Sequence, residues 1–151
     1  AVAAEALECL GGNGYVEESG MPRLYRESPL MSIWEGSGNV AALDALRAMV
    51  RQPDTVEAFF AETRLAEGAD PRLDSAIARV GKELADLEDA QYRARRVVEL
   101  MALVLQGAQL VRHGHPAVAE AFCRSRLDDD WGIAMGTLPT GVDTAAILDR
   151  V

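Results

Sequence analysis

Two short stretches near the start of the chain carry residue types that can do chemistry. The first is Gly11-Gly12-Asn13-Gly14-Tyr15. Glycines permit positive backbone φ and let a ligand approach peptide N–H groups closely, so such a loop can hold a pyrophosphate. It is not a Rossmann fingerprint, because the residues before it predict a helix where a strand should be. A plain helix-terminating turn stays open as the alternative.

The second stretch is Trp34-Glu35-Gly36-Ser37-Gly38. A carboxylate beside tryptophan and next to glycine can be desolvated, which would raise the pKa of Glu35 and make it a better base for a weakly acidic carbon. Ser37 supplies a hydroxyl, and Gly36 supplies a bare peptide for a ligand. The alternative is that Glu35 is an exposed loop acid or a helix-capping acid.

The elements that must position these stretches are predicted to be helices. Alanine, leucine, glutamate and arginine are abundant, and no sustained alternation of apolar and polar residues indicates a strand. The opening helix ends at Gly11-Gly12, and a short helix is expected from Pro22 to about Met31. A longer helix follows the Glu35 bend, with Ser37 or Asn39 as its cap. Its predicted inner face comprises Val40, Leu43, Leu46 and Val50.

The residues beyond Gln52-Pro53-Asp54 have the pattern of a helical bundle. A short amphipathic helix comprises Val56, Phe59, Phe60 and Thr63. Two longer apolar stripes follow, at Leu73, Ile77, Val80, Leu84 and Leu87, and at Ala94, Val98, Met101, Leu105 and Ala108. They predict bundle core rather than a cofactor site, and close helix contact is the expected reason for Gly81 and Gly107 within them. A last helical turn should begin at Asp143.

Composition and charge exclude several classes of protein. The chain has 151 residues, 49% hydrophobic and 26% charged, as in a folded globular protein. Its formal charge of -9 argues against wholesale binding to nucleic acid or an anionic membrane. Cys9 and Cys123 cannot build a disulfide scaffold. No apolar run is long enough to span a membrane and no leader pattern is present, so we expect a cytoplasmic protein.

Taken together, the two stretches resemble one known family. Residues 6–46 are similar to the C-terminal domain of the acyl-CoA dehydrogenase flavoproteins, through Ala6–Tyr15, Leu24-Tyr25-Arg26-Glu27 and Ile33–Ser37 in matching order. The longer span from Glu8 to Val40 resembles the AidB-like branch, as does the tail around Trp131-Gly132, Leu138-Pro139 and Ala145–Leu148. The resemblance implies an all-α fold. Residues 1–52 would be the end of the C-terminal helical-bundle domain, and residues 53–151 an AidB-like helical extension.

The resemblance also implies an activity. Members bind FAD and an acyl-CoA thioester, and a glutamate removes the α-proton while hydride leaves the β-carbon for flavin N5. Glu35 occupies the position of that base, and Gly36 and Ser37 would lie near the flavin or the thioester. Glu8, Gly11 and Gly12 match a segment that touches the FAD of a neighbouring subunit in the family's tetramers. Many members have glutamine at position 8, and an ionised glutamate would repel a pyrophosphate.

Other candidate residues have simpler explanations. Arg26 is expected to form a structural ion pair with Glu17, Glu18 or Glu27, and Cys9 to be a buried small apolar residue. His113, His115 and Cys123 match no established zinc spacing, so no metal site is predicted. Asp128-Asp129-Asp130 lacks the glycine and terminal glutamate of an EF-hand and is read as a solvated run.

A second function, duplex DNA binding, rests on an uneven distribution of charge. Residues 92–126 contain six arginines and two glutamates, which is +4 within a chain of -9. AidB-like proteins are associated with DNA binding through a basic helical region, and Arg93, Arg95 and Arg96 are the candidates here. The favoured alternative is that these arginines pair with nearby acids at helical spacing, such as Asp86, Glu88, Asp89 and Glu99.

The opening at Ala1, inside a helical pattern, leads us to expect a C-terminal piece of a longer protein. The intact parent is expected to be an FAD-dependent acyl-CoA dehydrogenase that acts on acyl-CoA and assembles as a homotetramer, with the remaining segment of the same parent as partner. The chain alone is expected to be inactive. A helical assembly module without catalysis is a third possibility.

Overall fold

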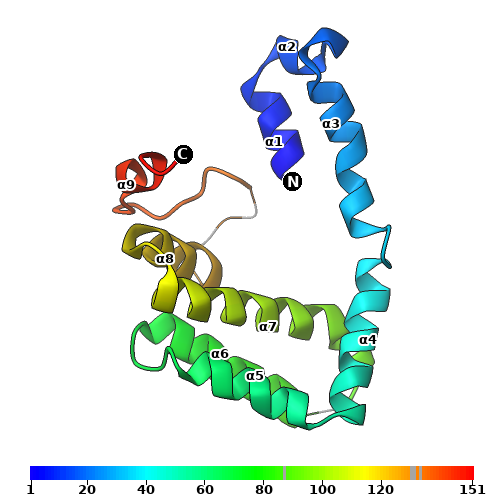
Figure 1. Ribbon diagram of the computed structural model, residues 1–151, viewed down its shortest axis with the longest axis vertical. Coiled ribbons are helices and arrows are strands. Elements are labelled where there is room, and N and C mark those ends of the chain that lie inside the picture. Colours follow the sequence, from blue (N-terminus) through cyan, green and yellow to red (C-terminus); the bar gives the residue numbers. More distant parts are fainter. Residues whose placement is uncertain (87, 130–131, 133) are drawn as a thin grey trace. The chain divides into compact units, whose positions relative to one another are not determined.

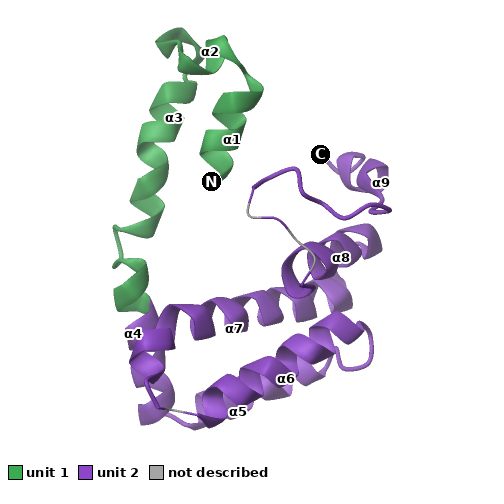
Figure 2. Ribbon diagram, turned by 180° about the vertical axis from the view of Figure 1, so that it is seen from behind, with its two compact units in different colours: residues 1–41 green, residues 42–151 purple. Residues whose placement is uncertain are grey.

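The computed structural model describes residues 1–86, 88–129, 132 and 134–151 (Figure 1). Of the described residues, 73% are helical and none forms a strand, so the predicted all-α class is confirmed. None of the helices in the described ranges is long and apolar enough to cross a membrane. Two compact units are present, Ala1–Ala41 and Ala42–Val151 (Figure 2).

The first unit is built from short helices. These are α1 (Val2–Cys9), α2 (Gly12–Tyr15), the 3₁₀ turn η1 (Glu17–Ser19), α3 (Met21–Glu27) and the 3₁₀ turn η2 (Ser28–Ser32). α1 ends before the glycine pair, as predicted, and lies against α3. The helix expected to reach Met31 is α-helical only to Glu27. Pro29 then lies in the first turn of η2, because proline lacks the N–H that an α-helix interior needs.

The helix α4 (Gly38–Arg51) crosses the division between the units. The units therefore divide at Ala41/Ala42, whereas the domain boundary predicted from Gln52-Pro53-Asp54 lies near the end of the same helix. The predicted inner face of α4 is wrong for this chain, since Val40 is 59% exposed and Val50 is 73% exposed. Ala42 is the buried residue of this helix. Leu43, Leu46 and Val50 instead line an open groove with residues of α5, α6 and α7.

The second unit contains a helical core. Its elements are α5 (Asp54–Arg64), α6 (Pro71–Ala85), α7 (Ala90–His113), α8 (Pro116–Phe122), the π-helical turn η3 (Cys123–Leu127) and α9 (Thr144–Leu148). α7 packs against α5, α6 and α8. The buried cluster comprises Ala66, Leu73, Ala76, Val80, Val104, Ala108, Cys123 and Leu127. Phe59 and Phe60 of α5 pack against it, as their spacing predicted.

The two predicted stripes differ in accuracy. Leu73 and Val80 of α6 are fully buried, in agreement with the pattern, while Leu87 lies outside the described residues. On α7 two of the predicted core residues, Val98 and Leu105, are each one position after the residue that is buried. Val97 and Val104 are buried, while Leu105, which the pattern predicted inside, is 39% exposed.

The two helical glycines also differ. A Cβ atom at Gly107 would lie 3.1 Å from Leu127 Cδ1 and 3.3 Å from Leu73 Cδ1, so close packing explains this glycine, as expected. A Cβ at Gly81 would meet nothing within 4 Å, so the same explanation is wrong there.

Candidate functional site

The glycine turn joins α1 to α2 in the first unit. The Gly11 N–H donates to the Glu8 carbonyl oxygen at 2.9 Å, and Gly11 then turns the chain at φ +56, a conformation that glycine adopts without strain. A Cβ at Gly11 or Gly12 would meet nothing within 4 Å, so the backbone of the turn is open to a ligand. Both predicted glycines are thus accessible at one end of α1.

Gly14 packs against α1, a role that was not predicted from the sequence. This glycine is buried, and a Cβ there would overlap the Leu7 carbonyl oxygen of α1. The third glycine of the stretch is therefore required by the close approach of α2 to α1. The sequence shows three glycines within four residues, but this pattern does not distinguish a glycine needed for packing from one that faces a ligand.

Glu8 lines a groove of about 600 Å³ between α1 and α3. The other lining residues are Ala4, Leu7, Tyr15, Glu17, Pro22, Tyr25 and Arg26. Arg26 Nη1 and Nη2 donate to the two carboxylate oxygens of Glu17 at 2.8 and 3.0 Å, which confirms the predicted structural ion pair and selects Glu17 as its partner. This bidentate contact lowers the pKa of the Glu17 carboxyl below its usual value.

The Glu35 bend lies between η2 and α4. The Trp34 N–H donates to the Leu30 carbonyl at 3.1 Å, and Gly36 turns the chain at φ +112. The Ser37 carbonyl then accepts the first hydrogen bond of α4, from the Ala41 N–H at 3.0 Å. Glu35, Gly36 and Ser37 are all exposed, and Trp34 is 62% exposed.

The expected desolvation of Glu35 is therefore absent in this chain, where Glu35 and Trp34 are both exposed, as in the alternative of an exposed loop acid. The six predicted residues form two separate clusters. Glu8, Gly11 and Gly12 lie together at the end of α1, while Glu35, Gly36 and Ser37 lie at the bend, and none of the latter three lines the groove at Glu8. Cys9, expected to be buried, is exposed.

The glycine turn offers two kinds of contact to a ligand. The open Gly11 and Gly12 backbone leaves room for a flat group, and the Glu8 carboxylate accepts hydrogen bonds from hydroxyl or amino groups. No arginine in the groove is left to bind phosphate, since Arg26 is held by Glu17.

The arginines proposed for DNA binding are largely engaged by acids of the same unit. Arg93 pairs with Glu83 and donates to the backbone carbonyls of Asp86 at 2.6 Å and Glu88 at 3.1 Å. Arg96 donates to Glu83 at 2.9 Å. Pairing with acids is thus confirmed for Arg93 and Arg96, and the predicted partner Asp86 lies 3.8 Å from Arg93. The expected helical spacing is wrong, because the shared partner Glu83 lies on α6.

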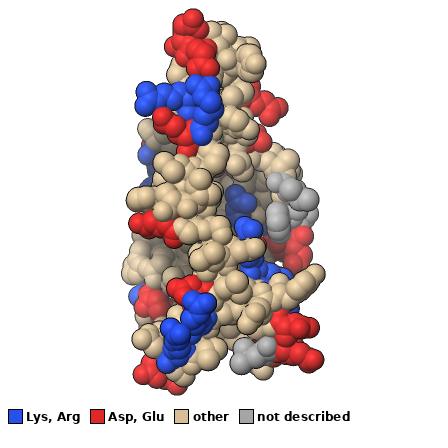
Figure 3. Space-filling model, turned by 90° about the vertical axis from the view of Figure 1, so that its right-hand side faces the viewer, with Lys and Arg blue, Asp and Glu red and all other residues tan. Residues whose placement is uncertain are grey.

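Arg95 is exposed, and in the described part of the chain it forms no ion pair. Arg93 and Arg96 line a groove of about 610 Å³ whose walls carry both signs of charge, with Lys82 and Arg126 beside Glu99 and Asp128. The space-filling view likewise has basic and acidic groups interspersed on the face toward the viewer (Figure 3). The groove at Arg93 and Arg96 is therefore not uniformly basic.

His115 and Cys123 have structural surroundings. The His115 Nδ1 atom accepts a hydrogen bond from the Ala117 N–H at 3.2 Å and caps α8. Cys123 is fully buried, and burial raises the pKa of its thiol to about 12. Across the described ranges no cluster of potential ligands could hold a metal ion. Of the aspartate run, Asp128 and Asp129 are exposed and Asp130 lies outside the described residues.

Comparison with known proteins identifies the family. Residues 1–50, which contain both the glycine turn and the Glu35 bend, match the acyl-CoA dehydrogenase C-terminal domain. The chain belongs to the acyl-CoA dehydrogenase family, in its AidB-like branch.

Three related proteins match this chain over longer stretches. AidB of Escherichia coli (strain K12) is 40% identical over 135 residues, covering 87% of this chain and 24% of that protein. Acyl-CoA dehydrogenase family member 11 of Caenorhabditis elegans is 29% identical over 129 residues, covering 73% and 21%. The 3-methylmercaptopropionyl-CoA dehydrogenase of Ruegeria pomeroyi is 32% identical over 91 residues, covering 59% and 16%. The chain spans about a quarter or less of these relatives, and its likeness to AidB extends well beyond residue 50.

Proposed function

We propose that this chain is the C-terminal part of an FAD-dependent acyl-CoA dehydrogenase in which Glu35 removes the α-proton of the thioester. The observation that carries the proposal is the position of Glu35, an exposed carboxylate at a glycine bend inside the segment that matches the family. The thioester carbonyl makes the α-proton acidic enough for a carboxylate base to remove it. FAD, when bound, supplies the acceptor for the hydride that leaves the β-carbon.

Glu35 needs a covering surface to act as a strong base, because an exposed carboxylate is well solvated. The neighbouring side chains are suited to being covered: Leu30, Met31, Ile33 and Trp34 are all more than half exposed. A patch of this kind is typical of a surface that packs against another segment. We propose that the remainder of the parent covers the bend and desolvates the Glu35 carboxylate.

Gly36 and Ser37 are proposed to lie near the flavin or the thioester. The positive φ of Gly36 lets the chain turn away directly after Glu35, and a side chain at this position would be strained. The Ser37 side chain is exposed and could donate a hydrogen bond to a ligand. Glu8, Gly11 and Gly12 are proposed to contact the adenosine end of an FAD held by a neighbouring subunit.

The experiment is the replacement of Glu35 by glutamine in the intact parent. Glutamine keeps the size of the side chain but cannot accept the proton, so flavin should stay bound while its bleaching by acyl-CoA slows by about 100-fold or more. Glu18→Gln, which changes another exposed carboxylate of the same unit, is the control and should bleach normally. Normal bleaching in the Glu35 variant would place the base elsewhere.

A tetramer and a cytoplasmic location follow from the resemblance and the sequence, and they stay predictions. The assembly-module alternative makes a different prediction for the same preparation: a colourless parent that does not take up FAD. The visible spectrum of the parent therefore separates a flavoenzyme from a helical module before any substrate is added.

A further inference from the structure

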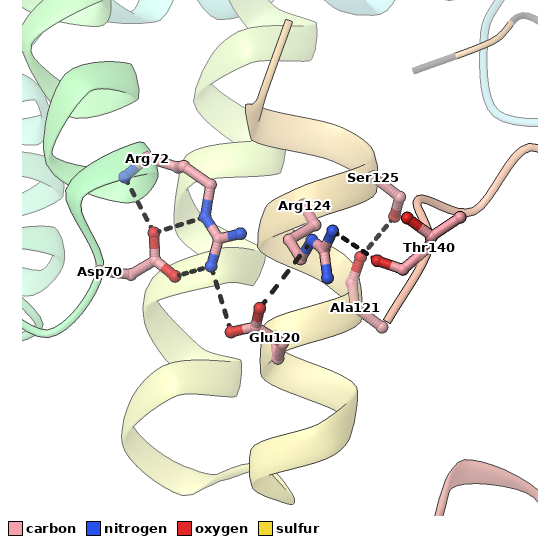
Figure 4. Close-up of polar contacts among 7 residues, drawn as sticks. All are labelled: Asp70, Arg72, Glu120, Ala121, Arg124, Ser125 and Thr140. Carbon is pink, nitrogen blue, oxygen red and sulfur yellow. Dashed lines mark hydrogen bonds and ion pairs between the residues drawn. The ribbon is translucent and has the colours of Figure 1, made fainter. Parts of the chain in front are cut away.

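A polar network outside the family-matched segment connects three parts of the unit 42–151 (Figure 4). Asp70 is the N-cap residue of α6, and its carboxylate accepts hydrogen bonds from the Arg72 backbone N–H at 2.8 Å and from Arg72 Nε at 2.9 Å. Arg72 Nη2 donates to Asp70 at 2.6 Å and also to Glu120 of α8 at 3.2 Å. Arg72 thus connects the start of α6 to α8.

The same network reaches the C-terminal segment through Arg124. Glu120 Oε1 lies 4.0 Å from Arg124 Nε, one helical turn further along the chain. Arg124 Nη2 donates a hydrogen bond of 2.8 Å to the backbone carbonyl oxygen of Thr140. Gly141 follows at φ +85, a conformation that favours glycine.

Residues 134–151, called the strap below, make few other contacts with the helical bundle. None of its residues is buried, and the core cluster comes from residues 66–127. Pro139, Val142, Ala146 and Ile147 are half-buried, and α9 packs against α8. Within the described ranges, Arg124 makes the side-chain hydrogen bond that joins the strap to residues 42–129.

We propose that the strap is a separately opening segment that Arg124 holds on the bundle, with Glu120 and Arg72 positioning Arg124. A segment with no buried side chain opens at lower free energy than the core, so it can detach while α5–α8 stay folded. The Arg124 guanidinium binds a backbone carbonyl, so its hold does not depend on any side chain of the strap. Opening uncovers the surface of α8 that α9 occupies and frees residues 134–151 to move.

The proposal is independent of the dehydrogenase activity and can be tested on the full chain by amide hydrogen exchange. In the unsubstituted chain, the amides of α9 should exchange faster than those of α6 and α7. Arg124→Ala should raise the α9 exchange rate about tenfold, the size expected for one hydrogen bond from a charged donor. The exchange of α6 and α7 should stay unchanged.

Arg126→Ala is the matched control, because Arg126 is exposed on the same turn and makes no polar contact within the described ranges; its α9 exchange should not change. Glu120→Gln should give a smaller increase than Arg124→Ala, since it weakens the positioning of Arg124 but leaves the hydrogen bond to Thr140. Exchange in α9 as slow as in α6 and α7, or unaltered by Arg124→Ala, would overturn the proposal. So would an equal rise in all helices, which would mean that Arg124 supports the whole bundle.

Discussion

At the level of single residues, Asp70 gives the second unit a defined sensitivity to acid. It is the one buried carboxylate in the described part of the chain, and the hydrogen bonds from Arg72 hold its pKa below the ordinary value of 3.8. A carboxyl whose pKa is lowered by folding stabilises the folded state above the unfolded pKa. That contribution is lost as the pH falls through the folded-state value.

We therefore expect Asp70→Asn to lower the free energy of unfolding by about 2 kcal/mol at pH 7, the size of a hydrogen bond to a charged group. Asparagine can still cap α6, so the loss reports mainly the contact with Arg72. As the pH falls below the unfolded-state value of 3.8 and through the lowered folded-state pKa, the difference between the two proteins should shrink, because Asp70 becomes protonated first in the unfolded state and then in both states. Urea unfolding at several pH values measures the stability difference between the unsubstituted chain and Asp70→Asn. A difference independent of pH would contradict the role of the Asp70 carboxylate.

Arg93 and Arg95 are close in sequence but differ in what they contact. Arg93 donates to backbone carbonyls just after α6 and pairs with Glu83, whereas Arg95 is exposed. Arg93→Ala should destabilise the second unit by about 1–2 kcal/mol, because it leaves those partners unpaired. Arg95→Ala should change stability by less than about 0.5 kcal/mol. The denaturant midpoints of the two variants test this difference in stability, and equal midpoints would contradict the greater role of Arg93.

The same contrast sharpens the DNA hypothesis. If duplex binding exists, Arg95 is the residue of the three whose charge is available, and Arg95→Ala in the parent should weaken binding to all sequences alike. It should also reduce the slope of log K against log salt by about 0.9, the value for one phosphate contact. Arg93→Ala should have the smaller effect on this slope. Absence of duplex binding by the parent at low salt would exclude the hypothesis.

At the level of elements, the two helical glycines form a natural comparison. Gly107→Ala puts a methyl group 3.1 Å from Leu127 Cδ1 and should destabilise the bundle by about 1–3 kcal/mol through overpacking. Gly81→Ala adds a methyl group to open space and should stabilise α6 by about 1 kcal/mol through helix propensity. Thermal or urea unfolding measures the change in stability for each variant. A stabilised Gly107→Ala variant would show that packing at Gly107 is not tight.

The helices themselves were largely predictable, and their contacts were less so. The stripe at Leu73 and Val80 places the buried face of α6 correctly because neither residue has a large apolar residue next to it in the sequence. On α7, Val97 and Val98 are both apolar, so the pattern alone could not choose the register. The Arg93–Glu83 pair joins α7 to α6 and follows no helical spacing rule. The family motif locates Glu35 in the sequence, but the groups that would cover its carboxylate are not predictable from this chain.

At the scale of the whole molecule, the position of Glu35 separates what the chain alone can do from what the proposed longer parent protein can do. In this chain the Glu35 carboxylate is exposed, Trp34 is 62% exposed, and the groove at Glu8 does not include the bend. A base in water at the surface lacks both the desolvation and the positioned substrate that α-proton removal requires.

The purified chain should therefore bind no flavin and should not turn over any acyl-CoA, while the parent should bind FAD and bleach with a suitable acyl-CoA. Mixing the chain with the remaining segment of the parent should restore flavin binding if the exposed patch from Leu30 to Trp34 is a surface that this segment covers. Ile33→Asp, which places a charge in that patch, should prevent this recovery, and Arg150→Asp, at an exposed site of the other unit, should not. Turnover by the chain alone would mean that the desolvation of Glu35 does not depend on the rest of the parent.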